Sequence, residues 1–528
     1  MRKIQYRRLL LLCLAFAIPL TAFGCQTGTD PNPNPNPAGP SPTIQATPLP
    51  ALTPQPEPED PAELITYQVS RAFSSNMVVQ RNQYVTVWGW ADQPGGILYG
   101  DFMGETRYAV VGADGNWKMQ FSPHPETAEP QTMRIKPIQG EETVFDNILV
   151  GDVWIVSGQS NAELQLTPTI AYLEKEQQSA LKDEIKADSQ IRIFTQTRTH
   201  VISDPAYYSA PQKDVTNPRW RWQVGCERGA YGNFSAIGYY FAMELRKNLP
   251  EVPIGMIMAA AGGACLRELL PAETANELGY SDTVTVPVGG YYNSLISPFV
   301  GLPFTGMLFY QGESEAAGDM YRNYARDLKA FVEELRTRWQ YDFPFYNVQL
   351  SSHGENQLSY WPQLPEIRNA QYQALSIIPN SYLAVSMDVG FREDEDDWAH
   401  PKNKNPVGQR LARLALATIY GKLSADDVCS PQPAEVTWES DAVLIRFAHT
   451  GEGLKLMEGT ELKGFQCVYN GTAEAAAAEV VDSRTVKVRL SKEGVSAVRY
   501  GMIPLAYPEN ANLCSSGGYP AAAFEWMK

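Results

Sequence analysis

Short apolar segments alternate with amphipathic ones between residues 151 and 423, and this alternation constrains the fold more than any other feature of the chain. The apolar segments are typical of buried strands and lie at residues 153–156, 254–259, 306–310, 345–350 and 382–387. In one amphipathic segment, apolar residues recur at helical spacing at Tyr324, Leu328, Phe331, Leu335 and Trp339. This alternation predicts a parallel sheet with helices on both faces. Because such sheets bind ligands at the carboxyl ends of their strands, the residues after each strand are the candidates for chemistry.

The regions on either side have a different pattern. From residue 65 to 150, and again from 434 to 526, short segments alternate between polar and apolar residues and are separated by turn residues, as in antiparallel β-domains. We therefore predict an N-terminal β-sandwich over residues 63–150, an α/β domain over 151–428 and a C-terminal β-domain over 429–528. The C-terminal domain is expected either to bind glycan or to have a structural role.

The N-terminus is typical of an exported protein. Basic residues precede an apolar run at 9–20, which is too short for a membrane span, so residues 1–24 are predicted to be a signal peptide. Small residues before Cys25 resemble a bacterial lipobox, which implies lipidation of Cys25 and membrane attachment through that lipid. Residues 25–62 are rich in proline and predict an extended linker. We expect an extracytoplasmic lipoprotein, at the cell surface or in the periplasm, with secretion as the alternative.

Charge and cysteine spacing argue against several classes of protein. The chain has 59 acidic and 43 basic residues and a formal net charge of −16, which disfavours binding to nucleic acid. The cysteines outside the signal form no close CxxC pair, so neither zinc nor a thioredoxin motif is predicted. The acidic run 393–397 has the ligand type that calcium prefers, but it lacks a glycine-punctuated loop, and a solvated acidic rim is the favoured interpretation. The sequence thus predicts no metal and no cofactor.

Three of the predicted strands are followed by residues that suit acyl transfer. The turn at 158–161 would hold the Ser160 hydroxyl clear of the sheet beside backbone N–H groups, as a nucleophile requires. After the second strand, the Gly263 amide can donate to an oxyanion, although a simple turn or packing role for Gly262 and Gly263 is the alternative. After the third strand, the Gln311 side-chain amide can supply another oxyanion donor.

His400 is the candidate general base. The chain has five histidines, and His400 is the one with an acid at triad spacing, because Asp397 lies three residues before it. A carboxylate at that spacing can fix the tautomer of the imidazole and stabilise the cation that forms when it accepts the serine proton. The neighbouring Asp396 is the second candidate for this acid.

In their order along the chain, these blocks resemble the sialate O-acetylesterase family of SGNH hydrolases. The matching text lies at 153–161, 253–263, 309–314 and 397–404, with supporting stretches at 76–80 and 234–239. The resemblance implies a flavodoxin-like α/β/α three-layer catalytic domain between two β-sandwich domains, and deacetylation without a metal. It also implies a triad of Ser160, His400 and Asp397. The oxyanion donors that it implies are on Ser160, Gly263 and Gln311, and the oxyanion or substrate-binding residues predicted from the same blocks are Asn161, Gly262 and Glu313.

The chain departs from the family pattern beside these blocks. Ala162 and Ala264 replace the usual methionine and threonine, and Arg267 and Glu268 replace an acidic residue and a small one. These changes leave the triad intact, but they leave the identity of the acetylated sugar undetermined. We predict a carbohydrate O-acetylesterase of the sialate 9-O-acetylesterase type that acts on an acetylated glycan through an acetyl-enzyme. The alternatives are an acetylxylan or hemicellulose acetylesterase, a surface glycan-binding lipoprotein with a vestigial esterase site and, more weakly, a glycosidase that uses Glu313.

Overall fold

The computed structural model describes residues 49–53, 55, 65–196, 206–227, 229–281, 286–354, 359–390 and 399–528. The predicted signal peptide, Cys25, most of the linker, and the acidic run with Asp396 and Asp397 lie outside these residues. Residues Asn34–Lys528 form one compact unit. Within the described part of the chain, no helix has both the length and the apolar character needed to cross a membrane.

A mostly parallel sheet forms the centre of the α/β region, as predicted. Its strand order is β10-β9-β11-β8-β12-β13-β14, and only the edge strand β10 runs antiparallel to its neighbour. The strands are β8 (Thr143–Gly158), β9 (Ile191–Thr195), β10 (Trp222–Val224), β11 (Ile254–Ala260), β12 (Gly306–Tyr310), β13 (Phe345–Gln349) and β14 (Ser381–Val385). The chain crosses over β8 between β11 and β12, so the strand order reverses there. The carboxyl end of β8 is therefore the expected place for a ligand.

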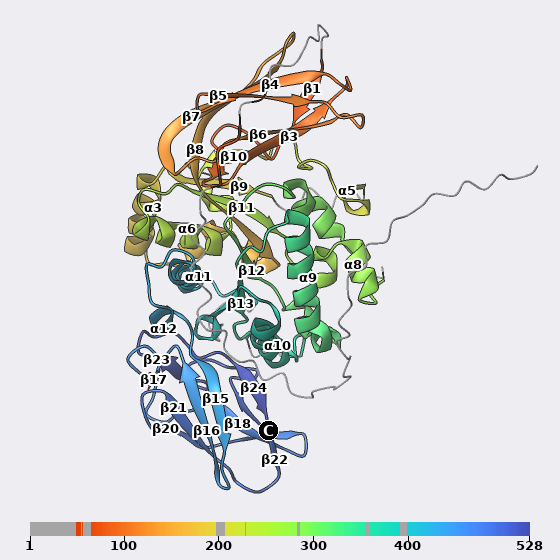
Figure 1. Cartoon of the computed structure of the whole chain (residues 1–528). Helices are drawn as coiled ribbons and strands as arrows, with labels where there is room; N and C mark the ends of the chain where they lie inside the picture. Colours follow the sequence, from red (N-terminus) through yellow and green to blue (C-terminus); the bar gives the residue numbers. More distant parts are fainter. Residues whose placement is uncertain are drawn as a thin grey trace, which may run out of the picture. The chain divides into compact units, whose positions relative to one another are not determined.

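Helices cover both faces of this sheet. Figure 1 shows α6 (Ala236–Asn248) and α11 (Asn405–Thr418) on one side of the strands, and α9 (Tyr324–Trp339) and α10 (Leu364–Ile377) on the other. The predicted stripe on α9 is confirmed, because Tyr324, Leu328, Phe331 and Leu335 are buried. The other α-helices of the described residues are α1 (Ser160–Glu163), α2 (Leu166–Ala171), α3 (Lys175–Ala187), α5 (Ala206–Ser209), α7 (Leu266–Leu269), α8 (Ala272–Glu277) and α12 (Ala425–Val428). The three-layer α/β/α architecture of the SGNH type is thus present.

The N-terminal β-region shares a strand with the α/β region. Its first sheet contains β1 (Tyr67–Val69), β3 (Val85–Ala91) and β6 (Asn116–Phe121). Its second contains β4 (Ile97–Phe102), β5 (Glu105–Val110) and β7 (Thr127–Pro137), with β7 paired to the first half of β8 and β2 (Val78–Gln80) parallel to β8. The predicted border between residues 150 and 151 falls inside β8, and side chains from both regions belong to one hydrophobic core.

The C-terminal region is built from antiparallel sheets around a second core. Four strands form one sheet: β15 (Gln432–Trp438), β16 (Ala442–Ala448), β20 (Ala478–Val480) and β21 (Thr485–Arg489). Four form another: β18 (Phe465–Tyr469), β19 (Thr472–Ala475), β22 (Val495–Tyr500) and β24 (Phe524–Met527). A short pair consists of β17 (Leu454–Leu456) and β23 (Leu513–Ser515). Tyr372, Leu383, Val385 and Met387 of the α/β region belong to this second core, so the two regions pack through apolar contact.

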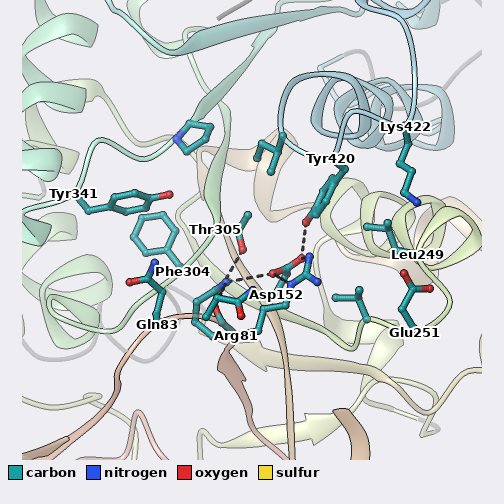
Figure 2. Close-up of a pocket in the computed structure, with 15 residues that line it drawn as sticks. Arg81, Gln83, Asp152, Leu249, Glu251, Phe304, Thr305, Tyr341, Tyr420 and Lys422 are labelled. Atoms are coloured by element: carbon teal, nitrogen blue, oxygen red, sulfur yellow. Dashed lines mark hydrogen bonds and ion pairs between the residues drawn. The ribbon is translucent and has the colours of Figure 1, made fainter. Parts of the chain in front are cut away.

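A buried carboxylate joins the N-terminal region to the amino ends of the parallel strands. Asp152 of β8 is 2% exposed and accepts hydrogen bonds from Arg81 Nε and Nη2, both at 2.9 Å, and from the Tyr420 hydroxyl at 2.7 Å. Gln80 Nε2 donates to the same carboxylate at 3.2 Å. These side chains line a pocket of about 380 Å³, with the Asp152 carboxylate between Arg81 and Tyr420 (Figure 2). This group, here called the Asp152 cluster, lies at the opposite end of the strands from the predicted site.

Candidate active site

Ser160 lies directly after the carboxyl end of β8, at the first residue of α1. Gly158 adopts a φ of +129°, and a Cβ atom there would lie 2.1 Å from the Tyr310 carbonyl oxygen. The Gln159 amide donates to that carbonyl at 3.0 Å, so the turn is fixed to the end of β12. Because only glycine tolerates this approach, the turn leaves the partly exposed Ser160 at the edge of the sheet where ligands are expected.

Gln159 joins the serine turn to the block at 311–314. Its side chain is 4% exposed, and its Oε1 accepts hydrogen bonds from the backbone amides of Gly312 and Ser314 at 3.3 and 3.2 Å. Nε2 of Gln311 donates to the same oxygen at 3.3 Å. The sequence analysis quoted Gln159 as part of a motif but assigned it no role. The structure shows that it holds two of the predicted blocks together.

Asn161 brings the serine turn and the His400 segment together. Its side chain is 1% exposed, and Nδ2 donates to Glu313 Oε1 at 2.6 Å and to the Ala399 carbonyl at 3.1 Å. Its Oδ1 accepts a hydrogen bond from the ammonium group of Lys404, which is itself 1% exposed. Asn161 and Ala399 are 238 residues apart and are the neighbours of Ser160 and His400. The predicted nucleophile and base therefore belong to segments that are in direct contact.

Two backbone amides at this edge are available to an oxyanion. Gly263 is exposed, has a φ of +77°, and its carbonyl accepts from the Ser314 hydroxyl at 3.1 Å. Among the residues that the structure describes, neither the Gly263 amide nor that of Ser160 donates a hydrogen bond. By contrast, the Gly262 amide donates to Glu163 Oε2 at 2.6 Å. The predicted pair of glycines thus divides into one open donor and one that is already used.

Gln311 lies near the site but is not open to a ligand. Its side chain is fully buried, and Nε2 donates to the Ala264 carbonyl at 3.1 Å and to the carboxylate of Glu315. An amide nitrogen carries two hydrogens, and with Gln159 Oε1 this one is surrounded by three acceptors within the chain, so neither hydrogen is left for a ligand. This arrangement argues against the predicted role of Gln311 as an oxyanion donor. It instead ties the end of β12 to the loop after β11.

Glu313 and Glu315 are buried carboxyl groups behind the site. Glu313 is 3% exposed, and burial raises its pKa, while the hydrogen bond from Asn161 and the charges of Lys404 and His400 oppose that shift. Burial also raises the pKa of Glu315, to about 7, although the Leu266 amide donates to its carboxylate. With 3% exposure, Glu313 offers almost no surface to a sugar. This burial argues against the substrate contact predicted for Glu313, and against the glycosidase alternative that would use it as an acid.

His400 is partly exposed and lies just before α11, on the segment that Asn161 holds. Its expected partners Asp397 and Asp396 lie outside the described residues, as does the acidic run considered for calcium, so the third member of the triad stays a prediction. Of the part of the chain that is described, no group of three His, Cys, Asp or Glu side chains is arranged to hold a metal. Lys404 was missed because a lysine after a histidine motif is normally interpreted as a surface residue.

The comparisons with known proteins agree with this geometry. The family described as carbohydrate esterase, sialic acid-specific acetylesterase, matches residues 150–417. The chain belongs to this family. Among curated relatives, the sialate O-acetylesterase of Pongo abelii is 26% identical over 302 residues, covering 52% of this chain and 55% of the relative. The enzyme of that name from Mus musculus is 25% identical over 441 residues, covering 72% and 77%.

The match to a solved structure extends further along the chain. A carbohydrate acetylesterase from Xanthomonas citri has a TM-score of 0.73 and 27% sequence identity, and the match covers 87% of this chain and 99% of that one. The chain spans about half the length of the first curated relatives that it matches. The family and the fold are thus established.

Proposed function

We propose that this protein is a serine carbohydrate O-acetylesterase with Ser160 as nucleophile and His400 as general base. The observation that carries the proposal is the hydrogen bond from Asn161 to the Ala399 carbonyl, because it joins the residues that flank Ser160 and His400. The position of Ser160 at the switch point of the sheet and the membership of the family support it. Asp397 would complete the triad by orienting the imidazole.

The open amides fit a two-step acyl transfer. The Ser160 hydroxyl attacks the acetyl carbonyl carbon as His400 accepts its proton, and the amides of Ser160 and Gly263 donate to the oxyanion that forms. When the tetrahedral intermediate collapses, the C–O bond to the sugar breaks and His400 protonates the departing sugar oxygen. Water, deprotonated by His400, then attacks the acetyl-enzyme. The second tetrahedral intermediate then collapses, which releases acetate and restores the Ser160 hydroxyl.

The test measures acetate release from 4-nitrophenyl acetate, acetylated xylan and acetylated sialoglycan. We expect Ser160→Ala and His400→Ala to lower kcat by about a thousandfold or more, because each removes one member of a unit that acts together. The matched controls are Ser376→Ala, an exposed serine on α10, and His124→Ala in the N-terminal region, and both should retain activity. Wild-type rates in either active-site variant would refute the assignment.

The substrate is proposed to be an acetylated sugar, with acetylated sialic acid and acetylated xylan as the two sources. The curated relatives are named for sialate, whereas the similar solved structure is named for carbohydrate in general. The ratio of kcat/KM on the two glycans distinguishes them. A folded wild-type protein that releases no acetate from any of the three esters would instead favour a vestigial site.

We also propose that the chain is exported and attached to a membrane through lipid on Cys25. Labelling of the producing cells with an alkyne-tagged palmitate should mark the wild type and the Cys226→Ser variant but not Cys25→Ser. Equal labelling of all three would exclude a lipid at Cys25 and favour another site of modification. An unlabelled wild type found in the medium would favour secretion.

A further inference from the structure

The sheet formed by β1, β3 and β6 has one buried face and one face that carries aromatic residues. On the core side, Val87, Met119 and Phe121 are almost fully buried. On the other side, Trp88 pairs with Lys118 and Trp90 with Asn116 across the two strands, so the four side chains share a face. Both tryptophans are partly exposed and Lys118 is exposed. We call these four residues the tryptophan face.

A hollow of about 420 Å³ adjoins the tryptophan face. All four of its residues line the hollow, together with Gly89, Val110, Gly112 and Trp117. Val110 is 55% exposed and adds an apolar side chain to the lining of the hollow. The volume lies in the range of small-molecule sites, so a sugar ring can be accommodated. Figure 1 shows β3 and β6 side by side in this sheet.

The Trp117 side chain lies beneath the tryptophan face, because side chains alternate along β6 and Trp117 shares the core side with Met119 and Phe121. It is 2% exposed, and its ring crosses β3 at Gly89, where an added Cβ would lie 2.7 Å from it. Among the described residues, no atom accepts a hydrogen bond from its indole N–H. This N–H has almost no exposed surface, so it is not a contact for a ligand, and the ring instead supports β3 between Trp88 and Trp90.

The ligand chemistry follows from this combination of groups. Indole rings offer flat apolar surface with a polar N–H, and the face of a pyranose ring that carries axial hydrogens is also flat and apolar. Asn116 and Lys118 add donors that hydroxyl or carboxylate oxygens of a sugar can accept. Trp88 is held in place by Phe73, with ring centroids 4.6 Å apart and an angle of 84°, so the surface is rigid.

We propose that the tryptophan face binds pyranose rings of the glycan chain whose acetyl esters the Ser160 site removes. This inference rests on the proposed function for the identity of the glycan, but not for the binding itself. A second contact with the same polymer raises the effective concentration of its esters near the active site. Polymeric substrates therefore benefit from the tryptophan face, whereas a small soluble ester does not.

The test is affinity electrophoresis of the full chain through native gels. The gels contain acetylated glucuronoxylan, the same xylan after alkaline deacetylation, or a sialylated mucin. We expect at least one polymer to retard the wild type, and we expect Trp90→Ala to raise the dissociation constant about tenfold, as for one lost aromatic contact. Tyr341→Ala removes a 38% exposed aromatic ring elsewhere and should leave retardation unchanged. All three proteins should hydrolyse 4-nitrophenyl acetate at the same rate.

Several results would overturn the proposal. One is a wild type that none of the three polymers retards, and another is a Trp90→Ala variant that is retarded as strongly as the wild type. If Trp90→Ala does not fold, Trp90→Phe and Lys118→Ala decide in its place, since the first should retain most of the binding and the second should weaken it. A wild type that is retarded but releases no acetate would refute the esterase function and leave the tryptophan face standing.

Discussion

The Asp152 cluster should carry a large share of the stability that links the N-terminal region to the central sheet. We expect Asp152→Asn to lower the free energy of unfolding by about 3 kcal/mol, because it removes a charge that Arg81 and Tyr420 contact while keeping the volume. Breaking a buried ion pair from one side usually costs about 3–5 kcal/mol. The lower end applies here because Glu126 still neutralises part of the Arg81 charge, at 2.9 Å.

The same cluster predicts a graded series. Tyr420→Phe removes one hydrogen bond to a carboxylate and should cost about 1.5 kcal/mol. Arg489→Ala is the control, because its pair with Glu479 is formed by side chains that are 62% and 50% exposed, and such pairs contribute only about 0–1 kcal/mol. Denaturation in urea, followed by tryptophan fluorescence, measures all three. Since the cluster lies at the far end of the strands from Ser160, folded protein should keep its esterase rate. An Asp152→Asn variant no less stable than Arg489→Ala would refute the reasoning.

Three further predictions concern the site itself. Gly158→Ala places a Cβ 2.1 Å from the Tyr310 carbonyl oxygen at a φ of +129°. It should therefore destabilise the fold by roughly 2 kcal/mol or more and abolish acetate release, and normal stability in urea would contradict this. Burial raises the pKa of Glu315 in the folded state from 4.5 to about 7, so the unfolded state loses this proton first and the free energy of unfolding should fall as pH rises from 4.5 to 7. Glu315→Gln should flatten that slope in urea denaturation, and an unchanged slope would show that another group causes it. Asn161→Ala should lower kcat on 4-nitrophenyl acetate by about tenfold to a hundredfold with little change in KM, because it frees the His400 segment from the serine turn. A change confined to KM would indicate that Asn161 contacts the substrate instead.

Five of the seven strands of the central sheet could be predicted because their cause is local, whereas β9, β10 and the order of the strands were not predicted. A strand with helices on both faces must be apolar throughout, and residues 254–259, 306–310 and 345–350 have that composition. The candidate site residues could be located from one rule, which is that parallel sheets bind ligands at the carboxyl ends of their strands. The continuous β8 was missed because it is partly exposed up to Asn147 and completely buried from Ile148 onward, so the change of environment resembled a domain border.

The roles of buried polar residues could not be predicted, because they depend on partners far along the chain. Gln311 follows a strand just as an oxyanion donor should, but its two hydrogens are shared among acceptors on Gln159, Ala264 and Glu315, and none of these contacts has a local signal. Lys404 ends the matched block 397–404 and was assigned no role from the sequence, yet it is 1% exposed and donates to Asn161, 243 residues away. The sequence pattern identified which blocks meet but not which of their atoms remain open to a ligand.

The serine turn is fixed by neighbours on three sides, and this arrangement explains how a short helix can hold a reactive group. Gly158 lies against Tyr310, Gln159 accepts from the block after β12, and Asn161 holds the segment before His400. These contacts end at β12, at the loop after it and at the segment before α11, so the backbone of the turn can shift only if several buried hydrogen bonds break together. Because an unpaired buried polar group costs about 1–3 kcal/mol, displaced positions of the serine are rarely populated. The geometry that acyl transfer needs is therefore maintained by the fold before any substrate binds.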